Sequence, residues 1–167
     1  MILKNKNAVI YGAGGAIGSA VAIAFAKEGA RVFLTGRDTS KLEAVANEIA
    51  AAGGSAEIAE VDALDKTAVM NHLTSVIERF GTVDISFNAI GIPQTGVQGI
   101  PLVQLPVESF VLPITTYSKS HFITAQAAAK HMAARKAGVI ITLTAAPSRL
   151  AAPWWVAWRP HGLQLNP

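Results

Sequence analysis

A chain of 167 residues, of which 51% are hydrophobic and 15% are charged, is long enough to bury a core and too apolar for a disordered protein. Because it contains no cysteine, it can form no disulfide, thiolate metal site or cysteine nucleophile. The net charge of +3 comes from lysines and arginines that are scattered along the chain, which argues against a nucleic-acid partner.

The amino-terminal residues 1–7 lead directly into an apolar run and leave no room for the core of a signal peptide. No apolar stretch reaches the roughly 18 residues that a membrane span needs. We therefore expect a cytoplasmic protein without a membrane partner.

Residues 9–18 are the most informative segment, because an apolar run gives way there to four glycines and is followed by an alanine-rich run. This order predicts a strand, a tight turn and then a helix from about Ile17 to Lys27. Glycine permits positive φ and a close backbone approach, and the free amides at the start of a helix attract phosphate. The alternative is an ordinary tight turn; the strand and helix on either side favour nucleotide binding.

Strand and helix patterns continue to alternate, which is typical of a parallel α/β sheet. The loop over 92–106 is rich in Pro, Gly and Gln, a composition that often covers a ligand. Pro113 is expected to kink or restart the long helix around it. The elements expected after the first helix are a strand at 31–35, a helix from a capping box at Ser40–Glu43 to Gly53, a strand at 56–61, a helix at 67–80 ended by Gly81, a strand at 83–87, a helix at 107–136 and a buried strand at 138–144.

Three motifs in this order resemble those of the short-chain dehydrogenase/reductase family, and the resemblance covers residues 4–150. It implies a Rossmann-type doubly wound parallel sheet with strand order 3-2-1-4-5, and NAD(P)(H)-dependent oxidation or reduction of a small-molecule carbonyl or secondary alcohol. Ala89 and Ile90 replace the second Asn and the Ala of the family's Asn-Asn-Ala-Gly segment. The matching residues are Gly12, Ala16 and Gly18 of the glycine signature, Asp62 after the third strand, and Asn88-Ala89-Ile90-Gly91 after the fourth.

The resemblance also implies which residues bind the cofactor. Asp62 could instead be a loop or helix-capping carboxylate, and Asn88 could be a turn former. The implied contacts are Gly12, Gly14, Gly15 and Ile17 along the pyrophosphate, Asp62 and Ala63 beside the adenine, and Asn88, Ala89 and Gly91 beneath the riboses.

The choice between NADP and NAD depends on the end of the second strand. NAD sites have an acidic residue there, whereas this chain has Gly36 followed by Arg37. A guanidinium can hold a 2′-phosphate in a bidentate manner, and Asp38 is expected to cap the next helix. Arg37 therefore favours NADP(H) over NAD(H), the alternative being a solvated surface arginine.

The catalytic groups of the family have no counterpart at the matching positions. The family uses a Tyr-x-x-x-Lys pair, a serine and an asparagine, yet Tyr117 is followed four residues later by His121. Ala145 stands where the serine would be, and Thr116 or Tyr117 stands near the asparagine position. No catalytic residue is predicted, and the four histidines have no metal-ligand partners at suitable spacing.

The chain is expected to divide into a nucleotide-binding domain at 1–150 and an irregular, Trp-rich tail at 151–167. The three tryptophans at 154–158 could form a partner or membrane patch, or lie on the core. Residues 159–167 resemble the family segment that follows the catalytic helix. This indicates that the catalytic helix and the last strands are missing, by deletion, frameshift or divergence. The open sheet edge left behind would promote association as a homo-oligomer.

Three hypotheses follow from the sequence. The first is an NAD(P)(H)-dependent short-chain oxidoreductase in catalytically incomplete form. The second is a non-catalytic module that binds NADP(H). The third is a non-functional fragment that neither binds nor turns over a nucleotide.

Overall fold

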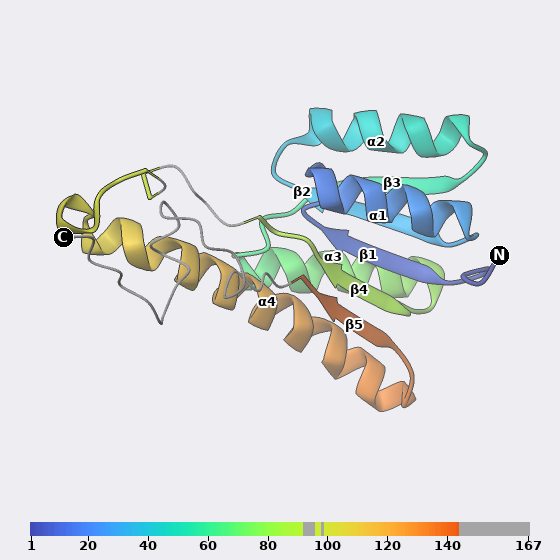
Figure 1. Ribbon diagram of the computed structural model, residues 1–167. Helices are drawn as coiled ribbons and strands as arrows, with labels where there is room; N and C mark the ends of the chain where they lie inside the picture. Colours follow the sequence, from blue (N-terminus) through green and yellow to red (C-terminus); the bar gives the residue numbers. More distant parts are fainter. Residues whose placement is uncertain (92–95, 98, 144–167) are drawn as a thin grey trace. The chain divides into compact units, whose positions relative to one another are not determined.

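The computed structural model describes residues 1–91, 96–97 and 99–143 (Figure 1). Within them strands and helices alternate as predicted. In chain order the elements are β1 (Asn7–Tyr11), α1 (Ala16–Lys27), β2 (Arg31–Gly36), α2 (Thr39–Ala51), β3 (Ser55–Glu60), α3 (Lys66–Phe80), β4 (Ile85–Asn88), the 3₁₀ helix η1 (Leu102–Gln104), α4 (Val107–Arg135) and β5 (Val139–Thr142).

The five strands form one parallel sheet in the order β3-β2-β1-β4-β5, which confirms the predicted doubly wound topology. The register aligns Tyr11 with Thr35 of β2 on one side and with Asn88 of β4 on the other. Gly36 at the end of β2 aligns with Glu60 at the end of β3. The carboxyl ends of β1 to β4 therefore lie along the same edge of the sheet, which we call the carboxyl edge.

Helices cover both faces of the sheet (Figure 1). Successive residues of a strand point to opposite faces, so Ala8 and Ile10 of β1 face one core, and Val9 and Tyr11 face the other. The first core includes Ala22 and Ala26 of α1 and Leu42, Val45 and Ile49 of α2. The second core includes Val69, Leu73 and Val76 of α3 and Ile123, Ala127, Ala128 and Met132 of α4.

The start of α2 corrects one expectation. The capping box at Ser40–Glu43 is wrong, because the helix already begins at Thr39 and Asp38 is its N-cap. The Ser40 hydroxyl donates to the Asp38 carboxylate at 2.6 Å and is therefore not the capping group. The separate expectation that Asp38 caps this helix is confirmed.

The burial predicted for the fifth strand is also wrong. All four residues of β5 are exposed, and Val139 retains 52% of its accessible surface. The unbroken apolar run suggested a buried strand, but β5 is the last strand of the sheet and pairs only with β4 among the described residues. The long helix α4 continues through Pro113, so the restart considered for that position does not occur.

The chain divides into two compact units. Met1–Gly91 and Ser118–Leu143 make up the first, which contains the whole sheet. The second includes Ile92–Tyr117, with η1 and the first part of α4. The boundary predicted at residue 150, and the Trp-rich tail after it, lie outside the described residues.

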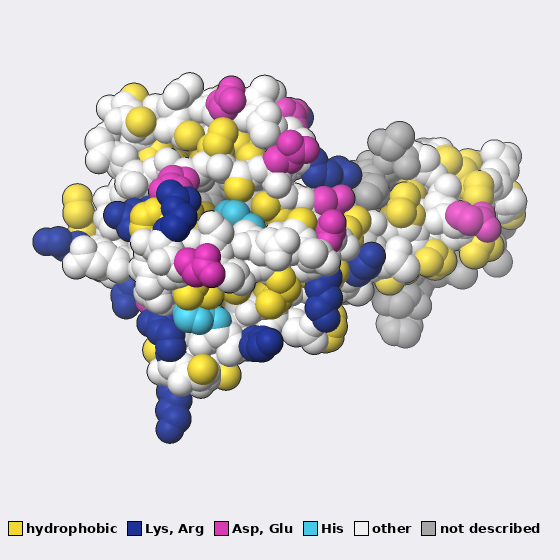
Figure 2. Space-filling model, turned by 180° about the vertical axis from the view of Figure 1, so that it is seen from behind, with side chains coloured by type: hydrophobic (Ala, Val, Ile, Leu, Met, Phe, Trp, Pro, Cys, Tyr) yellow, Lys and Arg dark blue, Asp and Glu magenta, His cyan; other side chains and the backbone are white. Residues whose placement is uncertain are grey.

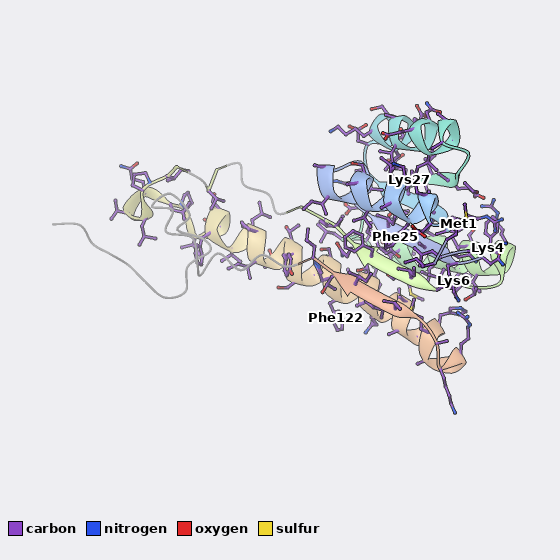
Figure 3. The ribbon with its side chains drawn as sticks, turned by 45° about the vertical axis from the view of Figure 1, so that its right-hand side comes forward. Met1, Lys4, Lys6, Phe25, Lys27 and Phe122 are labelled. Carbon is purple, nitrogen blue, oxygen red and sulfur yellow. The ribbon has the colours of Figure 1, made fainter. Side chains whose placement is uncertain are left out.

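Charges of both signs are mixed on the surface of the described residues. Figure 2 shows lysine, arginine and acidic side chains interspersed over one face, without a basic stripe on it. Lys4 and Lys6 lie near the amino end of β1, away from the carboxyl edge (Figure 3). No helix in the described part of the chain is both long and apolar enough to span a membrane.

His72 on α3 should make the stability depend on pH. Burial is the largest cause that lowers the pKa of this imidazole, with Glu57 opposing it and Arg79 adding to it. Because the folded-state pKa is the lower one, the unfolded chain binds more protons, and stability falls as the pH drops through about 6.5. Urea unfolding at about pH 7.5 and about pH 5.5 should show this loss, at most about 1.4 kcal/mol per pH unit. His72→Gln should reduce it; an unchanged pH dependence would contradict the assignment.

Candidate functional site

The glycine turn between β1 and α1 is held by the neighbouring strand. The backbone amides of Gly12 and Ala13 both donate to the carbonyl oxygen of Thr35, at 2.9 and 3.0 Å. The Gly15 amide donates to the Gly12 carbonyl at 3.1 Å, which closes the turn. Gly12 has a φ of +75°, a conformation that L side chains rarely adopt. The predicted strand, tight turn and helix are confirmed.

No side chain of the described residues caps the amino terminus of α1. Gly15 is the N-cap residue and supplies no side-chain hydrogen bond, and the first turn contains no acidic residue. The amides of a first helical turn have no intrahelical acceptor, and the helix dipole adds positive potential there. This end of α1 is therefore suited to an anionic group. By contrast, α2 and α3 begin with the capping carboxylates of Asp38 and Asp65.

The glycines of this segment differ in what surrounds them. A Cβ on Gly18 would overlap the carbonyl oxygen of Gly12, so α1 can pack against the turn only because residue 18 is glycine. A Cβ on Gly14 would lie 2.9 Å from the Cβ of Lys41 on α2. At Gly15 the nearest atom would be 3.4 Å away, an ordinary contact. Gly14 and Gly18 are thus required by packing within the chain, whereas Gly15 faces space that a ligand can approach.

Arg37 lies immediately after β2, at the carboxyl edge. Its side chain is exposed and forms no ion pair with any described residue. The neighbouring Asp38 is committed to α2, because it accepts from the Ser40 hydroxyl and lies 3.2 Å from the Lys41 ammonium. Hydrogen bonds from Ser40 and Lys41 lower the pKa of Asp38. Arg37 is therefore the uncommitted charge at this end of β2.

Asp62 and Ala63 follow β3 at the same edge. One carboxylate oxygen of Asp62 accepts from the Leu64 amide at 2.9 Å, so the side chain closes a turn before α3. Asp65 and not Asp62 caps that helix. Ala63 is buried and packs in the second core. Through its first oxygen, Asp62 acts as a loop carboxylate, one of the two alternatives considered for it. Its second oxygen accepts no hydrogen bond from the described residues.

Asn88 ends β4 with a buried side chain. Its Oδ1 accepts from the Ile90 amide at 2.9 Å, and its Nδ2 donates to the Thr124 hydroxyl on α4 at 3.0 Å. The Ala89 amide donates to the Tyr11 carbonyl at 2.9 Å. The Asn88 side chain thus bonds the backbone two residues on, as turn-forming asparagines do, and it holds the segment that leads to Gly91. Sequence reasoning did not find Thr124, because no local pattern marks a helical residue that meets a strand end 36 positions earlier.

The structure brings the predicted cofactor residues of four strands together at the carboxyl edge. Their order in the sheet follows from the register, with the glycine turn at the centre. In open parallel sheets this edge is where ligands bind. Ile17 is 49% exposed in the first turn of α1. From one side to the other, the residues are Asp62 and Ala63, Arg37, the turn Gly12 to Ile17, and Asn88 to Gly91.

Some sequence-based candidates lie outside the described residues. These include Thr144 and Ala145, and residues 92–95 and 98 of the 92–106 loop. Tyr117 and His121 both lie on α4, as predicted. Among the described residues there is no group of three or more His, Asp or Glu side chains that could hold a metal ion.

Tyr11 carries a buried hydroxyl that has no hydrogen-bond partner among the described residues. Burial raises the pKa of this phenol well above its usual range. Because an unsatisfied buried hydroxyl costs about 1–3 kcal/mol, Tyr11→Phe should leave the free energy of unfolding unchanged or raise it by about 1 kcal/mol. Tyr11→Leu, which removes the ring, should lower it. Urea unfolding measures both, and a loss above about 1 kcal/mol in Tyr11→Phe would contradict the prediction.

The chain matches known proteins over nearly its whole length. The family model described as short chain dehydrogenase matches residues 6–158. Gluconate 5-dehydrogenase of Gluconobacter oxydans (strain 621H) is 29% identical over 182 residues, covering 98% of this chain and 70% of that protein. A metagenomic short-chain oxidoreductase in complex with NADP superposes with a TM-score of 0.79 and 34% identity, over 91% of this chain and 67% of the other.

NAD⁺-bound xylitol dehydrogenase also superposes, with a TM-score of 0.84 and 25% identity, over 95% of this chain and 60% of the other. The similar structures thus include one with NADP and one with NAD⁺. The chain spans between 34% and 70% of the length of the curated relatives compared.

Proposed function

Because this chain belongs to the short-chain dehydrogenase family, we propose that it binds NADP(H) at the carboxyl edge, as the nucleotide-binding part of an oxidoreductase. The observation that carries the proposal is the start of α1, where a glycine turn leads into a helix without a side-chain cap or an acidic residue. The residues present fit a pyrophosphate there, since Gly15 leaves room for close approach and the first-turn amides are available as donors.

The rest of the nucleotide would lie along the same edge. Arg37 would bind the 2′-phosphate, which is why we propose NADP(H) rather than NAD(H). The second oxygen of Asp62 would accept from the adenine amine, with Ala63 beside the ring. The remaining contacts would be Gly12, Gly14 and Ile17 near the pyrophosphate and Asn88, Ala89 and Gly91 beneath the riboses.

The nicotinamide cofactor supplies the hydride chemistry when bound, and the proposed substrate is a small-molecule carbonyl or secondary alcohol. The described residues bind and orient the nucleotide. One observation favours a second candidate, a non-catalytic NADP(H)-binding module: the 167 residues contain no Tyr-x-x-x-Lys pair. For either candidate we propose a cytoplasmic location and association as a homo-oligomer.

The two candidates are separated by measuring NADPH binding and NADPH oxidation on the same preparation, with a panel of aldehydes, ketones and quinones. Binding with oxidation supports the oxidoreductase. Binding without oxidation of any compound supports the non-catalytic module. Absence of binding by the folded chain contradicts both candidates and leaves the hypothesis of a non-functional fragment.

A further inference from the structure

Thr124 on α4 joins the helix to the end of β4 through a buried hydrogen bond. Its side chain is 1% exposed and that of Asn88 is 2% exposed. The Thr124 hydroxyl donates to the Ser120 carbonyl at 2.9 Å, and its oxygen accepts from Asn88 Nδ2 at 3.0 Å. The hydroxyl thus both donates and accepts a hydrogen bond within the protein.

This contact sets which way the Asn88 amide points. With Nδ2 on Thr124, Oδ1 faces the chain and accepts from the Ile90 amide at 2.9 Å. An amide turned by 180° would place a donor against the Ile90 N–H and lose that hydrogen bond. The Thr124 oxygen and the Ile90 amide together therefore hold the Asn88 side chain, and through it the backbone that leaves β4.

The segment that Asn88 holds, residues 89–91, packs directly against the glycine turn. The Ala89 amide donates to the Tyr11 carbonyl at 2.9 Å. A Cβ on Gly12 would lie 3.0 Å from the Ala89 oxygen and 3.2 Å from the Ile90 Cα, so the two segments are in close backbone contact. A displacement of the backbone at Ala89 and Ile90 must therefore also displace the glycine turn.

We infer that Thr124 is a positioning residue for nucleotide binding, acting through Asn88 on the backbone of residues 89–91. The inference rests on the proposed function, in which those residues lie beneath the riboses. Of the residues in the proposed site, Thr124 contacts Asn88, and its effect on the nucleotide is exerted through the orientation of that amide.

The test compares Thr124→Val, which keeps the shape and removes the hydroxyl, with Thr124→Ser, which keeps the hydroxyl. Thr124→Val leaves the Asn88 amide without its acceptor, and the NADPH dissociation constant should rise about tenfold. Thr124→Ser should stay within about threefold of the wild type. Val83, buried just before the amino end of β4, supplies the control: Val83→Ala should destabilise the fold and leave the dissociation constant unchanged. Thr124→Val that binds NADPH as tightly as the wild type would overturn the inference.

A second readout needs no nucleotide. Amide hydrogen exchange at Ile90 should be faster in Thr124→Val than in the wild type and in Thr124→Ser, because its acceptor is no longer held. If Thr124→Val does not fold, Thr124→Ala is measured in its place against the same control. A wild-type chain that does not bind NADPH overturns the proposed function. Unchanged exchange at Ile90 overturns the positioning role, whatever the nucleotide result.

Discussion

Replacing Gly18 by alanine should cost the chain both stability and nucleotide binding, whereas replacing Gly15 by alanine should cost it nucleotide binding alone. A Cβ on Gly18 would overlap the Gly12 carbonyl oxygen. The atoms that it would meet belong to the backbone of Gly12 and Ala13, so the overlap can be relieved only by moving α1 away from the turn. Such overpacking costs about 1–3 kcal/mol or more. A Cβ on Gly15 meets only an ordinary contact at 3.4 Å, and the extended backbone there suits any residue.

Urea unfolding and NADPH titration measure the two effects separately. Gly15→Ala should unfold like the wild type and bind NADPH about tenfold more weakly, because its methyl group would narrow the approach to the α1 amides. Gly15→Ala that binds like the wild type would show that the pyrophosphate lies elsewhere. Gly18→Ala with wild-type stability would contradict the packing argument.

Replacing Arg37 by aspartate should reverse the preference between the two nucleotides. A charged hydrogen bond contributes about 1.5–3 kcal/mol, so the loss of Arg37 should raise the NADPH dissociation constant roughly tenfold to hundredfold. The new carboxylate would repel a 2′-phosphate and accept from the ribose hydroxyls of NADH.

The matched control is Lys4→Asp, which makes the same change in net charge at the amino end of the sheet (Figure 3). It should leave the ratio of NADPH to NADH affinity unchanged, since long-range charge effects are screened over about 10 Å. If Lys4→Asp shifts the ratio as much as Arg37→Asp does, Arg37 is a solvated surface arginine without a specific role.

The sequence was most informative where function and backbone conformation depend on adjacent residues. The glycine turn, the alternation of strands and helices, and the helix ends at Gly53 and Gly81 were predictable, because each depends on local periodicity or on glycine φ. The strand order was implied only by the family resemblance, and the structure confirms it. The Ser40 capping box failed because two candidate caps lie two residues apart, and the side chain of Asp38, not that of Ser40, accepts a hydrogen bond from an amide of the first turn.

Properties that depend on distant neighbours could not be predicted. The run Val139–Thr142 has the composition of a central strand, but burial depends on what lies beside a strand and not on its own residues. Asn88 was found by its motif, but its partner Thr124 lies 36 residues away on a helix whose register relative to β4 no local pattern specifies. The same limit applies to Thr35, whose carbonyl holds the glycine turn through two amides.

The central claim is that the open amino terminus of α1 and Arg37 together bind NADP(H). Calorimetric titration of the folded 167-residue chain with NADPH, and separately with NADH, tests it most directly. We predict saturable binding of one NADPH per chain, tighter than the binding of NADH. A chain that unfolds cooperatively in urea yet gives no binding signal with either nucleotide would contradict the claim.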